Sequence, residues 1–249
     1  MKRNLWIVAA VVCLLLAGPA FAGQEVHRSF SFRPGDTLEI ETERGDIEYR
    51  SGRGSELTVT IRAKNGDVED YLDLRFDDSD GVYIKGESTG RGSSFLSGLF
   101  GGGNQGGNIQ FLIEGPEHVD LIFSTSGGDI VLDDIDGTVK LGTSGGDITF
   151  SHIRGSIKAA TSGGDIQGDS VSEPSSLATS GGDIQLERAN ADLTVATSGG
   201  DIGVGEVGGE LKAATSGGNI EVMGARGDVE VSTSGGDILL ESMEGFVEA

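Results

Sequence analysis

The sequence predicts an all-β protein, a parallel β-solenoid (β-helix) of 18-residue coils preceded by an irregular β-strand N-terminal region. Two observations carry this prediction. The tetrapeptide Thr-Ser-Gly-Gly recurs at a constant step of 18 residues, and apolar residues alternate with polar ones on both sides of every copy. Eighteen residues are too few for a strand-helix unit. The tetrapeptides begin at Thr125, Thr143, Thr161, Thr179, Thr197, Thr215 and Thr233.

Each repeat is expected to form one coil with two strands. Counting the Thr as position 1, positions 6 and 8 are mostly apolar, and so are positions 15 and 17, which is the period of a strand with one buried face. Position 6 is always Ile, from Ile130 to Ile238. The Ser-Gly-Gly-Asp segment and the common Gly at position 13 are predicted turns, because Gly permits positive φ and Asp can bond nearby backbone. Stacked coils, about 4.8 Å apart, would bury one apolar column.

One repeat departs from the pattern. The unit from Thr161 has Gly168 at position 8, Pro174 near position 13 and Ser175 at position 15. It lacks an apolar anchor, and Pro has no N–H to give to a strand ladder. A local kink or bulge is therefore expected in this unit.

Residues 1–22 have the pattern of a secretory signal peptide. Lys2 and Arg3 precede an apolar run, and Ala20-Phe21-Ala22 offers the small residues of a cleavage site. The protein is therefore expected to be exported, to the periplasm or to the extracellular space or cell surface. The lone Cys13 lies within this segment, so the mature chain is expected to have no disulfide. No later segment is apolar enough over a sufficient length to span a membrane.

The residues between the signal peptide and the repeats fall into two regions. Residues 23–87 are expected to form strands, either degenerate opening coils or a small β-cap. Gly45-Asp46-Ile47 and Gly66-Asp67-Val68 resemble the turn-strand junction of the repeats. Residues 88–107 are a Gly/Ser-rich loop, and the solenoid occupies 108–249. The loop has four large apolar residues, which would either pack on the solenoid or contact a partner or membrane: Phe95, Leu96, Leu99 and Phe100.

The charge balance limits the partners. The chain has 18 Lys and Arg against 40 Asp and Glu, a formal net charge of −22. Such a balance disfavours nucleic acid and anionic lipid, which are bound by basic residues. The expected partner is an envelope protein or surface. The last coil is predicted to have no cap, so it would expose an edge or pair with another copy or protein.

Position 5 is the main candidate for chemistry, because stacking would place its carboxylates in one file. Each carboxylate could accept turn N–H bonds, or the file could hold cations such as calcium. Calcium-binding β-rolls have Gly-Gly in both halves of a coil, whereas these coils have it in one, so no metal site is assigned. The file consists of Asp129, Asp147, Asp165, Asp183, Asp201 and Asp237, with Asn219 as its one break.

Other chemical signals are weak. His27, His118 and His152 have no metal-ligand spacing and are expected to be surface or strand residues. Gly142-Thr143-Ser144-Gly145-Gly146 fits the G-x-S-x-G pattern but lies in a repeat turn, where no strand-to-helix elbow is expected. The small residues at position 18 and the Ser at position 2 would form a flat outward face able to dock a partner. No catalytic residue and no cofactor are predicted.

The Gly-Asp-Ile junctions, the Thr-Ser-Gly-Gly-Asp-Ile repeats and the signal peptide together resemble a bacterial family of "putative adhesins". The resemblance covers about residues 36–249 and implies a β-strand-repeat domain in exported proteins, with no family catalytic residue. The leading hypothesis is a non-enzymatic, exported, adhesin-like scaffold or interaction module of the cell envelope. The alternatives are a β-helix enzyme acting on glycans and a calcium-stabilised β-roll.

Overall fold

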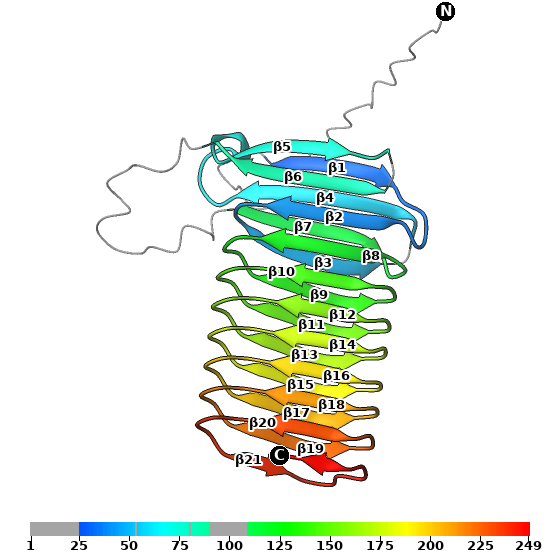
Figure 1. The fold of residues 1–249 in the computed structure, drawn as a ribbon. Helices are drawn as coiled ribbons and strands as arrows, with labels where there is room; N and C mark the ends of the chain where they lie inside the picture. The colour runs from blue at the N-terminus through cyan, green and yellow to red at the C-terminus, as the bar shows by residue number, and fades with distance from the viewer. Residues whose placement is uncertain (1–24, 53, 80, 90–108) are drawn as a thin grey trace, which may run out of the picture.

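The structure is a computed structural model, and it describes residues 25–52, 54–79, 81–89 and 109–249. These residues form a straight rod of two facing β-sheets, each with 11 strands (Figure 1). The predicted all-β solenoid fold is confirmed. Among the described residues the one helical element is a single 3-10 turn, η1 (Val68–Asp70). No helix in this part of the chain is long and apolar enough to cross a membrane.

Each repeat gives one strand to each sheet, and strands of successive coils pair in parallel. Sheet A contains the strands that start at position 6: β9 (Ile130–Ile135), β11 (Ile148–Ile153), β13 (Ile166–Val171), β15 (Ile184–Ala189), β17 (Ile202–Val207), β19 (Ile220–Ala225) and β21 (Ile238–Leu240). Sheet B contains those that start near position 15: β10 (Val139–Gly142), β12 (Ile157–Ala160), β14 (Ser175–Ala178), β16 (Leu193–Ala196), β18 (Leu211–Ala214), β20 (Val229–Ser232) and β22 (Val247–Glu248).

The register between coils is 18 residues throughout the repeats. Ile166 pairs with Ile148 on one side and with Ile184 on the other, so the isoleucines of position 6 form a continuous file. Ile130, Ile148, Ile166, Ile184, Ile202 and Ile220 have at most 1% of their surface exposed. Burying one such side chain contributes about 1.5–3 kcal/mol, which makes this file a principal source of stability.

The Thr of each repeat links two coils through hydrogen bonds, and it is buried in every repeat but the last, where Thr233 is half-buried. Thr143 Oγ1 donates to the carbonyl oxygen of Gly128 in the preceding coil at 2.9 Å, and it accepts the N–H of Gly146 at 3.3 Å. The same donation recurs from Thr125 to Thr233. A buried hydroxyl must be paired, so this arrangement explains a Thr file that faces the core.

The second Gly of each Thr-Ser-Gly-Gly is required by close packing between coils. A Cβ added to Gly182 would overlap the carbonyl oxygen of Gly164 in the coil before it, and the same holds at every equivalent Gly. The positive-φ glycines of the described chain are Gly35, Gly45, Gly66 and Gly81, none of which lies in these seven turns. The sequence-based reason for these glycines, a need for positive φ, is therefore wrong, and the reason is steric.

The irregular unit from Thr161 keeps its place in the stack. Between β11 and β13, Phe150 pairs with Gly168 and the next pair is Ile153 with Val171. In sheet B the pairing of β12 with β14 starts only at Lys158 and Ser176, and the Ser175 hydroxyl accepts the Ile157 N–H at 3.1 Å, so the irregularity is a local change in pairing. The side chains of Phe150 and Leu186, in the coils before and after, fill the space beside Gly168. A Cβ at Gly168 would overlap the Phe150 ring and a Leu186 methyl group. The neighbouring side chains thus fill the missing volume, and the rod continues without displacement (Figure 1).

The N-terminal residues form both a coil and a cap. The segment β2 (Thr37–Thr42) and β3 (Asp46–Gly52) is a coil stacked directly on β8 (Asp120–Thr125) and β9. Above it lie β6 (Val82–Ser88) and β7 (Ile109–Pro116), which also run parallel to the stack. The end is closed by antiparallel strands, with β1 (Val26–Ser31) on β4 (Glu56–Ala63), β4 on β7, and β5 (Leu72–Asp77) on β6.

The opposite end of the described rod has more exposed apolar side chains. Ile238 and Leu240 of β21 are only partly buried, although equivalent residues in earlier coils are buried. Leu239 and Phe246 have exposed fractions of 50% and 71%. This coil has a neighbour on one side only, which accounts for the lower burial.

Replacing an inward isoleucine by an acid tests the burial of position 6. Ile184→Asp places an unpaired carboxylate in the column and is expected to destabilise the fold by at least about 4 kcal/mol. Gln185→Asp changes the next, outward residue and is the matched control, expected to cost less than about 0.5 kcal/mol. Urea denaturation followed by circular dichroism measures both; equal stability of the two variants would contradict the inward assignment.

A pair of glycine variants tests the close approach of the coils. Gly182→Ala is expected to destabilise the protein by about 1–3 kcal/mol, since the methyl group overlaps a backbone carbonyl. Gly181→Ala is the control, because its nearest contact would be 3.6 Å from the Ser162 carbonyl oxygen and needs no movement. Thermal unfolding should separate the two variants, and identical melting temperatures would exclude the steric explanation.

Candidate functional site

The position-5 carboxylates form a hydrogen-bonded ladder between coils. Asp147 N–H donates to Asp129 Oδ1 at 2.9 Å, and Asp165 N–H donates to Asp147 Oδ1 at 2.8 Å. The series continues through Asp183, Asp201, Asn219 and Asp237, each donor bonding the side chain 18 residues before it. Each side chain therefore takes over the role that a backbone carbonyl has in an ordinary strand ladder.

This ladder explains why Asn replaces Asp at one position. The bond uses Oδ1 as an acceptor, which both residues supply, and Asn219 Oδ1 accepts the N–H of Asp237 at 2.8 Å. The carboxylates thus have a structural role that requires no cation, the first of the two interpretations that the sequence allowed. The ladder residues of the repeats are exposed, apart from the half-buried Asp165.

The ladder begins at Asp46, in the coil formed by β2 and β3. Asp46 Oδ1 accepts the N–H of Asp129 at 3.1 Å. Burial raises the pKa of the Asp46 carboxyl group above its ordinary value; the Asp129 N–H bond opposes this shift, and the nearby negative charge of Asp129 adds to it. The charged form of Asp46 therefore costs stability near neutral pH.

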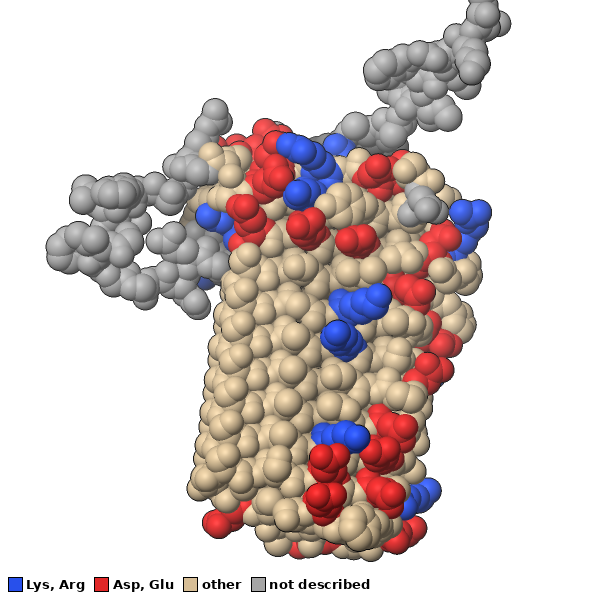
Figure 2. All heavy atoms as spheres, viewed as in Figure 1, with Lys and Arg blue, Asp and Glu red and all other residues tan. Residues whose placement is uncertain are grey.

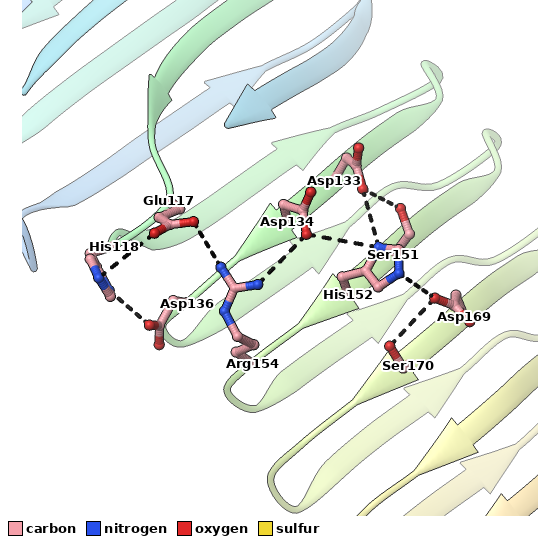
Figure 3. A network of polar contacts seen from close by, with 10 residues as sticks. All are labelled: Glu117, His118, Asp133, Asp134, Asp136, Ser151, His152, Arg154, Asp169 and Ser170. Atoms are coloured by element: carbon pink, nitrogen blue, oxygen red, sulfur yellow. Dashed lines mark hydrogen bonds and ion pairs between the residues drawn. The ribbon is translucent and has the colours of Figure 1, made fainter. Parts of the chain in front are cut away.

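A cluster of titratable side chains lies on the first repeat coils, on the outer side of β9 and β11 (Figure 3). Asp134 and His152 occupy equivalent positions, 18 residues apart, and have φ of 54° and 51°. Residues with a Cβ seldom take this left-handed conformation. The ladder pairs Ser151 with Asp133 and then Ile153 with Ile135, so Asp134 and His152 stand outside it and project together.

His152 lies among three carboxylates. Its Nε2 is 3.0 Å from Asp169 Oδ2, and its Nδ1 is 3.6 Å from Asp133 Oδ1 and 3.8 Å from Asp134 Oδ1. Asp133 Oδ1 also accepts the Ser151 hydroxyl at 2.6 Å. The His152 side chain is 58% exposed, so each of these contacts contributes no more than about 1 kcal/mol.

Arg154 joins this cluster to a second histidine. Its guanidinium lies 3.0 Å from Glu117 Oε2 and 3.6 Å from Asp134 Oδ1, while His118 Nδ1 lies 2.8 Å from Asp136 Oδ2 (Figure 3). Two histidines that are 34 residues apart in sequence thus belong to one surface network. His27 lies elsewhere, with its Nδ1 3.1 Å from Thr60 Oγ1.

The ligand atoms of Asp133, Asp134 and His152 all lie within 4.8 Å of one another, and this set of side chains suits a transition metal. Each of these three side chains also contacts another side chain of the protein: Asp133 contacts Ser151, Asp134 contacts Arg154, and His152 contacts Asp169. The network therefore holds together through protein contacts. Sequence reasoning missed the cluster because it looked for ligands at short spacing. The sequence feature that could have found it is the 18-residue separation of Asp134 and His152, because residues 18 apart lie side by side in stacked coils.

Comparison with known proteins places the chain in a family. Residues 35–245 match the model of the Toastrack DUF4097 family, so the match covers most of the sequence. The chain belongs to this family.

Three solved structures similar to this Toastrack chain are a "putative adhesin" from Bacteroides fragilis NCTC 9343, a "putative cell adhesion protein" from Clostridium sporogenes ATCC 15579 and a "putative lipid binding protein" from Parabacteroides distasonis ATCC 8503. Their identities are 16%, 11% and 18%, and their TM-scores are 0.49, 0.37 and 0.41. The matches cover 90%, 88% and 90% of this chain and 96%, 100% and 95% of theirs. No match was found among curated proteins.

The outward face predicted from positions 18 and 2 is present in this Toastrack rod. Figure 2 shows a long strip of the surface without charged side chains. Ser144, the centre of the G-x-S-x-G match, is exposed in the turn between β10 and β11, so the match does not form a strand-to-helix elbow. The small residues of position 18 are Gly142, Ala160, Ala178, Ala196, Ala214 and Ser232.

The loop proposed as a contact segment is described only at its margins. Ser88 ends β6, Thr89 N–H donates to the Tyr71 carbonyl oxygen at 3.0 Å, and Ile109 begins β7. β6, which precedes the loop, belongs to sheet B, and β7, which follows it, belongs to sheet A. Its four apolar residues, Phe95, Leu96, Leu99 and Phe100, lie outside the described residues.

An Asp46→Asn variant tests the charge at the start of the ladder. Asn keeps the acceptor for Asp129 N–H and removes the partly buried charge, so the melting temperature should rise at pH 7. Because the folded state raises the pKa, the wild-type protein gains stability as pH falls through that pKa; the advantage of Asn should therefore vanish below the ordinary value of 3.8. Asp46→Ala, which removes the acceptor, should be less stable than Asn. A variant no more stable than wild type at pH 7 would refute this account.

Proposed function

We propose that this protein is a non-enzymatic, adhesin-like scaffold of the bacterial cell envelope that acts by binding other molecules along the outer faces of its coils. The signal-peptide pattern of residues 1–22 supports export. The mature chain would then function in the periplasm or at the cell surface, where a rigid rod can extend a binding surface away from its attachment.

The observation that carries the proposal is the continuity of the faces in the repeats. From β8 to β22 every coil keeps the same register and has short turns, so the outer surface is an uninterrupted set of parallel files. Such a surface presents the same geometry every 18 residues and suits repeated, shallow contacts. The position-5 carboxylates, which resemble a functional file, are engaged in holding the coils together.

The charge of the chain further limits the classes of partner that it can bind. With a net charge of −22, the protein resists association with other acidic macromolecules except where its surface is locally neutral or basic. The uncharged strip and the adjoining face of sheet B meet this condition (Figure 2). We therefore expect contacts to concentrate on sheet B and the neighbouring turns.

Export and surface binding can be tested together. The full chain with a C-terminal tag should appear outside the cytoplasm, shortened by the signal segment, in cell fractionation followed by mass spectrometry. The purified mature protein should bind intact cells or envelope fractions saturably, and unlabelled protein should compete. The Ile184→Asp variant, which has nearly the same composition but a disrupted column, is the control and should not bind.

Two results would contradict the proposal. An uncleaved chain retained in the cytoplasm would exclude the envelope assignment. Release of reducing sugar from envelope polysaccharide, abolished by changes in the outward acids, would instead show a glycan-degrading enzyme.

A further inference from the structure

The middle of sheet B carries a basic pair in a strongly acidic protein. Lys140 of β10 pairs in register with Lys158 of β12, and both side chains are exposed. Ser176 of β14 and Thr194 of β16 continue the same outward file. Parallel pairing therefore lines up two ammonium groups and two hydroxyl groups along the rod axis.

Neither lysine has a carboxylate partner among the described residues. Lys212, farther along the same file, lies 3.2 Å from Glu210 and 3.5 Å from Glu230, and its hydrogen bond to Glu210 raises its pKa. Figure 2 shows that the middle of the rod carries few charged side chains on the face that it draws. Like charges directly opposite each other on adjacent strands destabilise a sheet, so an anion placed between them would be stabilising.

A shallow hollow adjoins this pair. It has a volume of about 340 Å³, and its lining includes both lysines, Ser176, Thr194 and one carboxylate, Asp192. Pro174 and Ser175 of the irregular unit also line the hollow, and the Ser175 hydroxyl accepts the Ile157 N–H at 3.1 Å. Hydroxyl groups and cationic side chains at the rim offer donors to a ligand that is both polar and anionic.

We infer that this hollow and the file from Lys140 to Thr194 bind an acidic polysaccharide running along the rod axis. The coils are about 4.8 Å apart, close to the length of one hexose unit, so successive sugars can meet successive coils. Carboxylate or sulfate groups would pair with Lys140 and Lys158. Sugar hydroxyl groups would bond Ser176 and Thr194.

The surrounding acids set the position of such a chain. Asp192 lies at one end of the hollow and Asp120 occupies the same corner in the coil before Lys140. Each has one oxygen engaged by a backbone N–H, that of Glu210 for Asp192 and that of Thr138 for Asp120. Beyond them Glu210 and Glu230 would repel an anionic group. Because salt screens charges beyond about 8 Å at physiological ionic strength, the lysines dominate locally over the net charge of the chain.

A membrane surface fits this face less well than a polysaccharide. The exposed large apolar side chains lie on sheet A (Val131, Met223 and Leu239) or on the last coil (Phe246 and Val247), so none lies at this hollow. A flat anionic bilayer would also meet the glutamates of the flanking coils on the same face. A single narrow chain can contact the lysines without covering those acids.

This inference rests on the proposed surface-binding function and names its ligand class. The direct test measures binding of the mature protein to polygalacturonate and to dextran sulfate, with uncharged dextran as the matched neutral polymer. Isothermal titration calorimetry should show binding of an acidic polymer and none of dextran. Added salt should weaken it, since ion pairs supply the attraction.

Variants locate the site. Lys140→Ser combined with Lys158→Ser should weaken binding about tenfold, since two exposed ion pairs are lost. Serine already occupies this file at position 176, so the fold should tolerate the change, and the melting temperature checks it. Lys212→Ser removes a lysine of the same file that is paired with acids, and it should leave the affinity unchanged.

Three outcomes would overturn the inference: folded wild-type protein that binds neither acidic polymer, a double variant with wild-type affinity, or anionic lipid vesicles bound as tightly as the polymers. The envelope-binding experiment separates a failure of the polysaccharide site from a failure of the proposed surface-binding function. If the wild-type protein binds envelopes but not the polymers, the polysaccharide site is wrong and the surface-binding function stands. If it binds neither, both are wrong.

Discussion

Close contact between the backbones of neighbouring coils is the constraint on which the structure depends. At the second Gly of each turn, one coil approaches a carbonyl oxygen of the preceding coil so closely that a Cβ would overlap it; a Cβ on Gly182, for example, would overlap the Gly164 carbonyl oxygen. This approach permits the hydrogen bond from Thr179 to the Gly164 carbonyl and the bond from Asp183 N–H to Asp165. Together they set the 18-residue register. The apolar column then follows, because the register places Ile on Ile.

A fixed register converts any side chain into a neighbour of the one 18 residues away. Where both members are charged, the protein must accommodate the pair. The aspartates do so by accepting backbone N–H groups, and Lys212 does so through Glu210 and Glu230. His152 is accommodated by carboxylates from the coils before and after its own. Lys140 and Lys158 are the pair for which the described residues supply no such partner, which is why they indicate a ligand.

The N-terminal end shows a different kind of constraint. The coil of β2 and β3 comes early in the chain, yet β3 lies between β7 and β9, which are formed by residues beyond 108. The stack can therefore be completed only after distant segments have come together, a non-local step of the kind that slows folding. Antiparallel β1, β4 and β5 then close the end and cover strands that would otherwise be open edges.

The sequence alone determined the coil, its inward positions and its turns, because a periodic pattern of burial must satisfy the same local geometry in every repeat. It also located the strands near Thr37 and Val82, because the alternation of apolar and polar residues that predicts a strand is visible within each segment. It could not order the N-terminal coils, since β2 and β3 carry no local sign that β7 will lie above them. Nor did it reveal the cluster of Asp134 and His152 or the Lys140–Lys158 pair, because each depends on contact between coils. The sequence states which residues repeat; only the stacked backbone decides which of them touch, because parallel pairing joins residues that are distant along the chain.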